Sequence, residues 1–592
     1  MFTTRPELVG TFGMVASTHW LASQSGMAVL EAGGNAFDAA VAAGLVLQVV
    51  EPHLNGPGGE VPIIAWEDRT SRPFVVCGQG VAPAAATINC FDAMDLDIVP
   101  GTGLLPAVVP GAFGAWMLLL REHGTMRLRD VLKYAIGYAE GGFVLLPTIA
   151  KAISGVSGLF TEHWLSSAKV WLAAGTDPAP GTLFKNSDLA ATYSRIVEDA
   201  ESASSDREEQ IEAARRSFYE GFVAEAVAEF YAGELMDVTG VPHAGLLRYE
   251  DLAGWRPAVE EPLTMDYRGL TVLKAGPWTQ GPAFLQQLAL LEGYDVGGLA
   301  PSSPELIHLV VECSKLAFAD REAYYGDPRF ADVPLAELLS PCYNDARRRL
   351  VTDSAVVDGL NPGSVAGRIP RLPTIPDVDT DEKVASLGEP TVRRDGRVQG
   401  DTCHLDVADR FGNVVTATPS GGWFQSSPVV PGLGFSITTR GQMFWLERGL
   451  PNSLEPGKRP RTTLTPSMTL RGGAPYLAFG TPGGDMQDQW TLLFFLRHVD
   501  HGMNLQEAID APTWHTTHFP SSFYPRRAEP GHLLVEDRVG DETVQELRDR
   551  GHRVTVEGPW TLGRTSAVSR DKHGVLRAAA NPRGMQGYAV GR

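Results

Sequence analysis

The sequence predicts an α+β protein in which helices cover sheets of short strands. Apolar residues recur every three or four positions from residue 15 to 50 and again, with interruptions, from about 109 to 350. Strand patterns follow in residues 404–409, 414–418 and 475–480, where β-branched and apolar residues prevail. Length alone predicts about four domains, and one large intertwined domain is the alternative.

Composition and charge exclude several classes of partner. The formal net charge is −20 and no basic run occurs, so we expect no nucleic-acid surface and a small molecule as partner. The first residues lack a basic segment followed by an apolar stretch of about 7–15 residues, and no run approaches about 18 apolar residues. We therefore expect a cytoplasmic protein without a membrane span. Five widely spaced cysteines predict no disulfide framework, and we expect no metal and no cofactor.

The first predicted elements are two packed helices within residues 15–50, joined at Gly33-Gly34-Asn35. The glycine-rich residues 55–60 come next and predict a turn that brings backbone amides close to a bound group, or a plain helix-to-strand connection. Residues 61–66 then have the pattern of a strand.

The long helical region that follows includes residues 306–325, and we expect its helices to cover a sheet. Residues from about 360 to 400 are rich in Pro, Asp and Arg and poor in aromatic residues, which is typical of an exposed, mobile linker. Such a long linker inside a compact protein needs a reason, and proteolytic release of one of its ends is one.

Thr402 lies where that release would uncover a new chain end. It precedes the strand pattern of residues 404–409, which forms a predicted hairpin with residues 414–418. A threonine hydroxyl is a weak nucleophile that needs an adjacent base, and a free α-amine with a pKa of about 7.7–8.0 can serve when the threonine is N-terminal. The alternative is an ordinary strand start with a capping hydroxyl.

A second feature is the turn Thr481-Pro482-Gly483-Gly484-Asp485, between the strand pattern of residues 475–480 and a predicted helix from about 487 to 497. Successive amides at a Gly-Gly turn before a helix N-terminus stabilise an anion. The sequence thus offers a nucleophile and an anion site on separate segments.

The order of its short motifs makes the whole chain resemble the gamma-glutamyltransferase family of N-terminal-nucleophile hydrolases. The motifs are LASQSG (21–26), AGGNAFDAA (32–40), VEPH (50–53), GPGG (56–59), VPG (109–111), FADR (318–321), GDP (326–328), KRP (458–460) and TPGG (481–484). Each motif is weak alone, and their shared order carries the resemblance.

The resemblance implies a four-layer αββα sandwich, made as one precursor that cuts itself between Asp401 and Thr402. Residues 1–401 would form a large subunit and 402–592 a small one, which stay together as one intertwined domain; a dimer of such pairs is left open. Position by position, Thr402 matches the nucleophile, Thr418 the hydroxyl that supports it, and Gly483 with Gly484 the oxyanion-hole glycines.

The implied reaction is acyl transfer from a small-molecule amide. Thr402 attacks the carbonyl, an ester forms, the amine leaves, and water or another amine releases the acyl group. Arg459 with Thr462 and Thr463 matches the substrate-holding loop of the family, where Ser-Ser is usual.

The chain departs from the family where true gamma-glutamyl enzymes bind the charged glutamyl head. The positions of an arginine, an acidic residue and an asparagine hold Ile88, Phe444 and Gly422. Unpaired buried charges are costly, so a glutamyl group should bind poorly. Aromatic residues in these segments could instead line an apolar acyl pocket or simply belong to the core. The further residues that we expect at the substrate site are Ser420, Trp423 and Phe444.

Three hypotheses follow. The first is a self-processing amidohydrolase or acyltransferase acting on a non-glutamyl amide, since the family contains cephalosporin-acylase-like and oxamate-hydrolysing members. The second is a genuine gamma-glutamyltransferase or glutathione hydrolase with a rearranged clamp, in which Glu447 or Asp485 takes over the ammonium contact. The third is an inactive scaffold.

Overall fold

Two seven-stranded sheets packed face to face form the centre of the computed structural model, which describes residues 2–172, 175–365, 367–375 and 402–592. In spatial order, sheet I consists of β21 (Tyr588–Gly591), β2 (Gly13–Ser17), β12 (Leu405–Asp409), β13 (Val414–Ala417), β3 (Val61–Glu67), β4 (Arg72–Gly78) and β9 (Ala258–Glu260). Sheet II consists of β1 (Leu8–Gly10), β20 (Leu576–Ala580), β19 (Ser566–Arg570), β15 (Ala474–Gly480), β14 (Ser467–Arg471), β11 (Leu270–Lys274) and β10 (Leu263–Tyr267). Neighbouring strands in both sheets run antiparallel.

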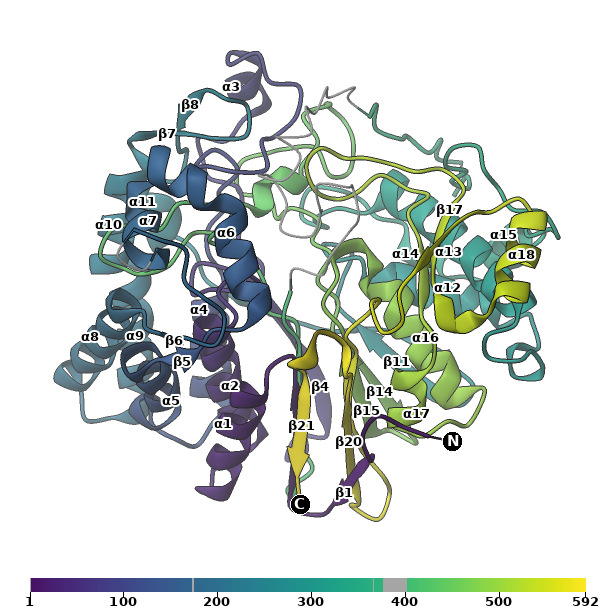
Figure 1. Cartoon of the computed structure of the whole chain (residues 1–592), viewed down its shortest axis with the longest axis horizontal. Coiled ribbons are helices and arrows are strands. Elements are labelled where there is room, and N and C mark those ends of the chain that lie inside the picture. The colour runs from purple at the N-terminus through teal and green to yellow at the C-terminus, as the bar shows by residue number, and fades with distance from the viewer. Residues whose placement is uncertain (1, 173–174, 366, 376–401) are drawn as a thin grey trace.

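Helices cover the outer face of each sheet, so that the layers read helix, sheet, sheet, helix from left to right in Figure 1. The helices on the side of sheet I are α1 (Trp20–Glu31), α2 (Ala36–Val50), α4 (Ala112–His123), α5 (Leu128–Gly141), α6 (Pro147–Glu162), α7 (Leu165–Trp171), α8 (Ser187–Ala203), α9 (Arg207–Tyr219) and α10 (Phe222–Tyr231). Those on the side of sheet II include α12 (Gly281–Leu291), α13 (Pro304–Tyr324), α16 (Gln487–Val499), α17 (Leu505–Asp510) and α18 (Asp541–Asp549).

Shorter elements complete the described chain. The remaining helices are α3 (Ile88–Asp92), α11 (Tyr249–Ala253), α14 (Leu335–Leu338) and α15 (Pro341–Arg348). The remaining strands are β5 (Phe143–Val144), β6 (Leu183–Phe184), β7 (Glu234–Met236), β8 (Pro242–Ala244), β16 (Trp514–Thr516), β17 (His532–Glu536) and β18 (Arg553–Glu557).

The side chains of the central strand β12 alternate between two cores. Leu405 and Val407 pack with the helices outside sheet I. Ala408 packs between the sheets, with Ala478 of β15 and Val568 of β19. Because successive residues of a strand point to opposite faces, even-numbered residues of this segment face sheet II. The predicted αββα sandwich is confirmed. Residue 402 and its even-numbered neighbours point into the space between the two sheets.

The predicted helix pair is confirmed as α1 and α2. Gly33 between them has a φ of +97°, and Asn35 caps α2 together with Asp38. The segment 15–50, which we predicted as helical, starts within a strand instead: residues 13–17 form β2, which pairs with β12 on one side and β21 on the other. The region from 109 to 350 likewise contains the β10–β11 hairpin as well as its helices.

The predicted linker divides into a part that is packed and a part that lies outside the described residues. Residues 360–365 and 367–375 form no helix or strand, but they are held on the protein body. Gly363 N donates to Asp320 at 2.9 Å, Val365 is buried, and Arg371 binds Glu447 at 2.7 Å. The rest, residues 376–401 with Asp401, is not described.

The predicted subunits are interleaved in both sheets. In sheet I, β2 lies between β12 and β21, although it belongs to residues 1–401 and they belong to residues 402–592. In sheet II, β1 pairs with β20 and β11 pairs with β14 across the same division. A cut before Thr402 would therefore leave two pieces joined by continuous backbone hydrogen bonding.

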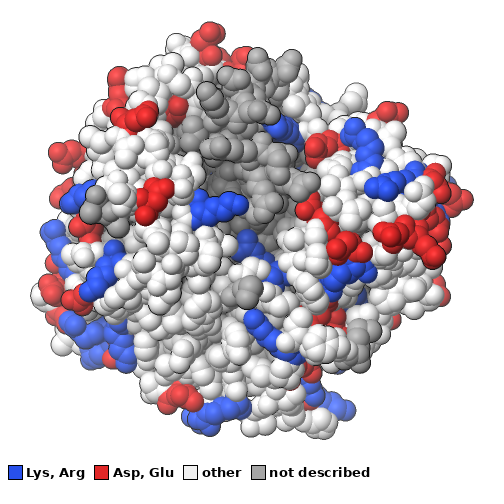
Figure 2. Space-filling model, in the orientation of Figure 1, with Lys and Arg blue, Asp and Glu red and all other residues white. Residues whose placement is uncertain are grey.

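The surface carries charges of both signs. Figure 2 shows acidic and basic side chains scattered over one face without a continuous basic area. Within the described part of the chain, no helix is both long and apolar enough to span a membrane.

We predict that Val407→Ala lowers the thermal midpoint of unfolding, because Val407 is fully buried on the central strand. Removing its two methyl groups should cost roughly 2 kcal/mol of transfer and cavity free energy. The matched control is Val144→Ala, since Val144 is 54% exposed. Scanning fluorimetry should show a lower midpoint only for the first variant; equal midpoints would contradict the placement of β12.

Candidate active site

Thr402 is held opposite Ser420 by the register of the β12–β13 hairpin. Leu405 pairs with Ala417, and beyond the regular ladder Thr402 forms a bridge with Ser420. The two hydroxyl oxygens lie 3.3 Å apart, and both residues are completely buried. Between them, Cys403 N donates to Pro419 O at 3.0 Å. The open end of the hairpin thus presents two hydroxyl groups side by side.

The same register gives Thr418 a different neighbour from the one that we expected. Thr418 lies across from His404, and its Oγ1 is 2.9 Å from His404 Nδ1. His404 Nε2 donates to Asp406 Oδ1 at 3.0 Å, so the two ring nitrogens bind Asp406 on one side and Thr418 on the other. The hydroxyl beside Thr402 belongs to Ser420, so the geometry favours Ser420 for the supporting role, and the role of Thr418 stays a prediction. In an antiparallel hairpin each step back along one strand is a step forward along the other, so moving from His404 to Thr402 moves its partner from Thr418 to Ser420.

His404 and Asp406 form a buried polar row between the sheets that the sequence analysis did not identify. Ser566 of β19 donates to Asp406 Oδ2 at 3.0 Å and ties the row to sheet II. Gly480, at the end of β15, lies so close that a Cβ there would come within 2.2 Å of His404 Cε1. The available signal was the even spacing of residues 402, 404 and 406, which places all three on one face of a strand.

This contact with Gly480 brings the Gly-Gly turn to the end of sheet I. Gly483 and Gly484 follow β15 directly, with φ angles of +131° and +52°, and lead into α16. A Cβ on Gly484 would lie 3.1 Å from the ring of Phe523. Both backbone conformations favour glycine, and the turn stands directly before the N-terminus of a helix, a position where backbone N–H groups stabilise an anion.

A buried ion pair lies behind Ser420. Arg440 Nε donates to Glu60 Oε1 at 2.6 Å, and Arg440 Nη2 donates to Ser420 Oγ at 2.9 Å. Glu60 ends the glycine-rich turn of residues 55–60, and its backbone forms a reciprocal pair with Ser420 at 2.8 and 3.0 Å. That turn is therefore packed against the hairpin, and a Cβ on Gly59 would collide with Ser420 O at 2.1 Å.

Trp423 belongs to a small cluster with Met443 and Phe523, beside this ion pair. The Arg440 guanidinium carbon lies 4.8 Å from the ring centroid of Trp423 and 5.6 Å from that of Phe523. The cluster thus connects Ser420, through Arg440, with Phe523 and Gly484. The cluster is thus buried beside both predicted catalytic segments.

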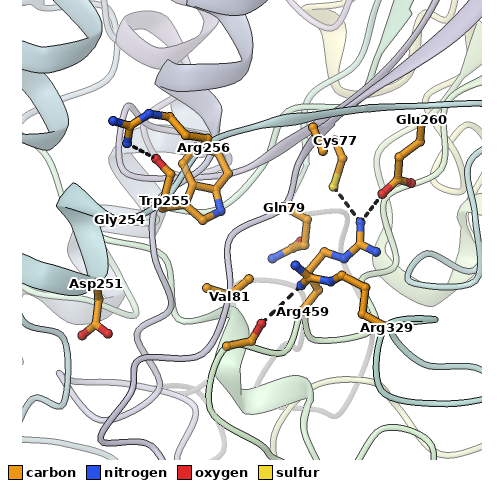
Figure 3. Close-up of a pocket in the computed structure, with 12 residues that line it drawn as sticks. Cys77, Gln79, Val81, Asp251, Gly254, Trp255, Arg256, Glu260, Arg329 and Arg459 are labelled. Atoms are coloured by element: carbon orange, nitrogen blue, oxygen red, sulfur yellow. Dashed lines mark hydrogen bonds and ion pairs between the residues drawn. The ribbon is translucent and has the colours of Figure 1, made fainter.

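Arg459 anchors its loop instead of reaching toward the hairpin. Its guanidinium donates to Asp327 at 2.9 Å. It also donates to Glu260 at 2.5 Å and to Cys77 Sγ at 3.2 Å (Figure 3). It lines a pocket of about 440 Å³ with Arg256 and Arg329, and Thr402 is not among the lining residues. These contacts hold the loop in place, and the role of a substrate contact that we assigned to Arg459 stays a prediction.

The two threonines after Arg459 differ in their contacts. Thr462 N donates to the Trp278 carbonyl at 2.8 Å, which fixes the path of the loop. The Thr463 hydroxyl is buried and has no hydrogen-bond partner among the described residues. A buried hydroxyl without a partner costs free energy, so Thr463 is available to a bound molecule.

The positions of the glutamyl clamp are apolar or closed. Ile88 and Phe444 pack in one hydrophobic cluster. Gly422 has a φ of +69°, and a Cβ there would lie 2.9 Å from Ser436 O, so an asparagine would not fit without a shift. The suggested replacements are already paired: Asp485 binds Arg321 at 2.5 Å and Ser522 at 2.6 Å, and Glu447 binds Arg371 at the surface.

One group of buried side chains far from this site has the composition of a metal site. His308 Nδ1 lies 2.9 Å from His552 Nε2, and Glu312 is near both. Glu312 also binds Lys315 Nζ at 2.6 Å, and His308 Nε2 donates to Thr352 O at 2.7 Å. Because the ammonium group of Lys315 already neutralises the carboxylate, we assign no metal here.

Comparison with known proteins gives consistent matches over the whole chain. The family model described as gamma-glutamyltranspeptidase matches residues 22–591. The glutathione hydrolase-like YwrD proenzyme of Bacillus subtilis (strain 168) is 32% identical over 99% of both chains. The acylase ACY 1 proenzyme of Pseudomonas sp. (strain SE83) is 32% identical over 96% of this chain and 92% of its own.

Solved structures match over the same extent. The structure of LmbA2991HD is 56% identical, with a TM-score of 0.94 and complete coverage of both chains. A cephalosporin acylase from Bacillus halodurans is 29% identical, with a TM-score of 0.81, over 100% of this chain and 97% of its own.

We predict that Ser420→Ala slows self-cleavage before Thr402 by roughly tenfold or more, the equivalent of one lost hydrogen bond of about 1.4 kcal/mol. Ser420→Thr keeps the hydroxyl and is the matched control. Thr418→Val removes a hydroxyl from His404 and should slow cleavage less. Intact-mass measurement over time gives the rates, and a greater loss in Thr418→Val would return the supporting role to Thr418.

Proposed function

The chain belongs to the gamma-glutamyltranspeptidase family, and we propose that its Thr402 is the nucleophile of a self-processing amidohydrolase or acyltransferase that acts on a non-glutamyl acyl group. The observation that carries the proposal is the pairing of the Thr402 and Ser420 hydroxyls at 3.3 Å, on the central hairpin of the αββα sandwich. That position suits a nucleophile because the surrounding strands fix it from both sides.

Self-cleavage is the first step. Thr402 Oγ1 attacks the carbonyl carbon of Asp401 while its proton passes to the departing amide nitrogen. The C–N bond breaks, leaving residue 401 as an ester on Oγ1 and freeing the Thr402 α-amine. Water then hydrolyses the ester, which releases residues 1–401 and restores the hydroxyl.

The same oxygen then acts on the substrate. The α-amine accepts the Oγ1 proton as Oγ1 attacks the amide carbonyl, and it later gives that proton to the leaving amine. Two N–H groups of the Gly483–Gly484 turn would hold the tetrahedral oxyanion, and each such donor is worth about 3 kcal/mol. Water or a second amine takes the acyl group from Thr402.

The composition of the site favours an acyl group without a zwitterionic head. Ile88 and Phe444 are apolar and packed together, and the carboxylate of Asp485 is already paired. The cluster of Trp423, Met443 and Phe523 offers an apolar wall beside Ser420. Relatives named as an acylase and as an oxamate amidohydrolase of Klebsiella pneumoniae match 96% and 98% of this chain, so a small carboxylate amide or an acylated amine suits the family as well.

We predict that wild-type protein yields two masses, for residues 1–401 and 402–592, whereas Thr402→Ala stays whole because it lacks the attacking oxygen. Thr402→Ser keeps the oxygen and should still be cut, which separates the loss of chemistry from misfolding. Intact-mass analysis of the three proteins gives the answer. Cleavage of Thr402→Ala at the same bond would refute the assignment.

Three anilides that share one leaving group test the acyl preference. We predict that glutaryl and butyryl anilides turn over at least about tenfold faster, by kcat/KM, than the gamma-glutamyl anilide, because the two described carboxylates considered for its ammonium group, Asp485 and Glu447, are already paired. Glutaryl differs from gamma-glutamyl only in lacking that group. A preference for gamma-glutamyl would support the alternative, a glutathione hydrolase with a rearranged clamp.

A further inference from the structure

Arg440 is a completely buried arginine placed one side chain away from Thr402. Its Nη2 donates to Ser420 Oγ at 2.9 Å, and that oxygen lies 3.3 Å from Thr402 Oγ1. Nothing in the reaction described above uses Arg440 or its partner Glu60. A buried charge so close to a nucleophile requires a physical reason, since its burial is costly unless it is paired.

The contacts of Arg440 form a closed ring. The Glu60 carboxylate binds Arg440 at 2.5 Å, Arg440 binds the Ser420 side chain, and the backbones of Ser420 and Glu60 pair with each other. Gly421, which follows Ser420, has a φ of +78°, and a Cβ there would lie 2.6 Å from both Glu60 carboxylate oxygens. The rings of Trp423 and Phe523 confine the guanidinium further. Arg440 therefore has little freedom to move.

This ring has a consequence for the Ser420 hydroxyl. A guanidinium only donates hydrogen bonds, so its bond occupies a lone pair of Ser420 Oγ. The single Ser420 proton then points away from Arg440, and Thr402 Oγ1, 3.3 Å from Ser420 Oγ, is one of the groups within its reach. A donor aimed at Thr402 Oγ1 orients the oxygen and stabilises negative charge that develops on it during attack.

We propose that Arg440 is a positioning residue for Thr402 that acts through Ser420, and that Glu60 holds Arg440 in place. The inference rests on the proposed function, because it assumes that Thr402 is the nucleophile. Self-cleavage depends on this arrangement more than substrate turnover does, because the uncut chain has no α-amine at Thr402 to serve as base. Arg440 does not contact the substrate in this account.

A double-mutant cycle on the self-cleavage rate tests whether Arg440 acts through Ser420. We expect Arg440→Met and Ser420→Ala each to slow the appearance of the 402–592 piece by about tenfold or more. The double variant should be no slower than Ser420→Ala, because without the hydroxyl Arg440 has nothing to orient. If the rate losses of the two single variants multiply in the double variant, the proposal is overturned.

A second pair of variants separates positioning from folding. Arg440→Met leaves Glu60 buried and unpaired, whereas Glu60→Gln with Arg440→Met removes both charges. We expect this neutral pair to fold, with a thermal midpoint near that of the wild type, yet to cleave about as slowly as Arg440→Met. Arg440→Lys, which keeps the charge and a donor, should recover part of the rate. Wild-type cleavage in the folded neutral pair would show that Arg440 is structural only.

Kinetics of the cleaved enzyme give a third readout. In the fraction of Arg440→Met that matures, we expect a lower kcat with KM within about twofold of the wild type, since substrate contacts are unchanged. A raised KM with normal kcat would make Arg440 a substrate contact and overturn the positioning role. If Thr402→Ala is itself cleaved, the proposed function fails. If Thr402→Ala stays whole but the Arg440 variants cleave at the wild-type rate, this inference alone fails.

Discussion

The register of one hairpin governs the geometry of the whole site. Pairing of β12 with β13 sets Thr402 against Ser420 and turns residues 402, 404 and 406 into the space between the sheets. A slip of one residue would direct Thr402 into the helical layer and bring Cys403 into its place. The register is secured because β2 and β3 pair on the outer edges of the hairpin and both faces are buried. The packing of the core therefore fixes the position of Thr402.

Local features of the sequence were enough to predict much of the fold. The helix pair, the β12–β13 hairpin and the Gly-Gly turn each depend on residues close together in the chain, and the order of motifs gave the layers. Arg440 could not be predicted in this way, since its partner Glu60 is 380 positions distant. The β10–β11 hairpin was missed although Arg268-Gly269, with φ angles of +51° and +80°, marks its turn. That Ser420 rather than Thr418 lies opposite Thr402 follows from the register of the hairpin alone, and a resemblance of motifs does not supply that register.

The site is apolar at the positions of the glutamyl clamp and carries a buried ion pair beside Ser420. Where the related gamma-glutamyl enzymes are expected to bind a charged head, Ile88 and Phe444 pack together. Among the described residues, a pair of opposite charges, Glu60 and Arg440, lies instead behind Ser420 and Thr402. An ion pair that is already satisfied does not attract a charged substrate, but it orients neutral hydroxyl groups near it. In the proposed mechanism this polarity would serve the attacking oxygen of Thr402, and recognition of the acyl group would depend on shape and apolar contact.

Interleaving of strands from both sides of Thr402 gives the uncut chain a role of its own. Because β2 must enter sheet I between β12 and β21, neither piece can complete its sheet alone. While the chain is continuous, this insertion is an intramolecular event with a high effective concentration; between separate pieces it would be a bimolecular encounter of two incomplete, aggregation-prone sheets. Once assembled, the hydrogen-bonded sheets no longer depend on the peptide bond. The precursor thus acts as a folding template for the two-chain form, and a cleaved molecule that unfolds has lost the connection that assembled it.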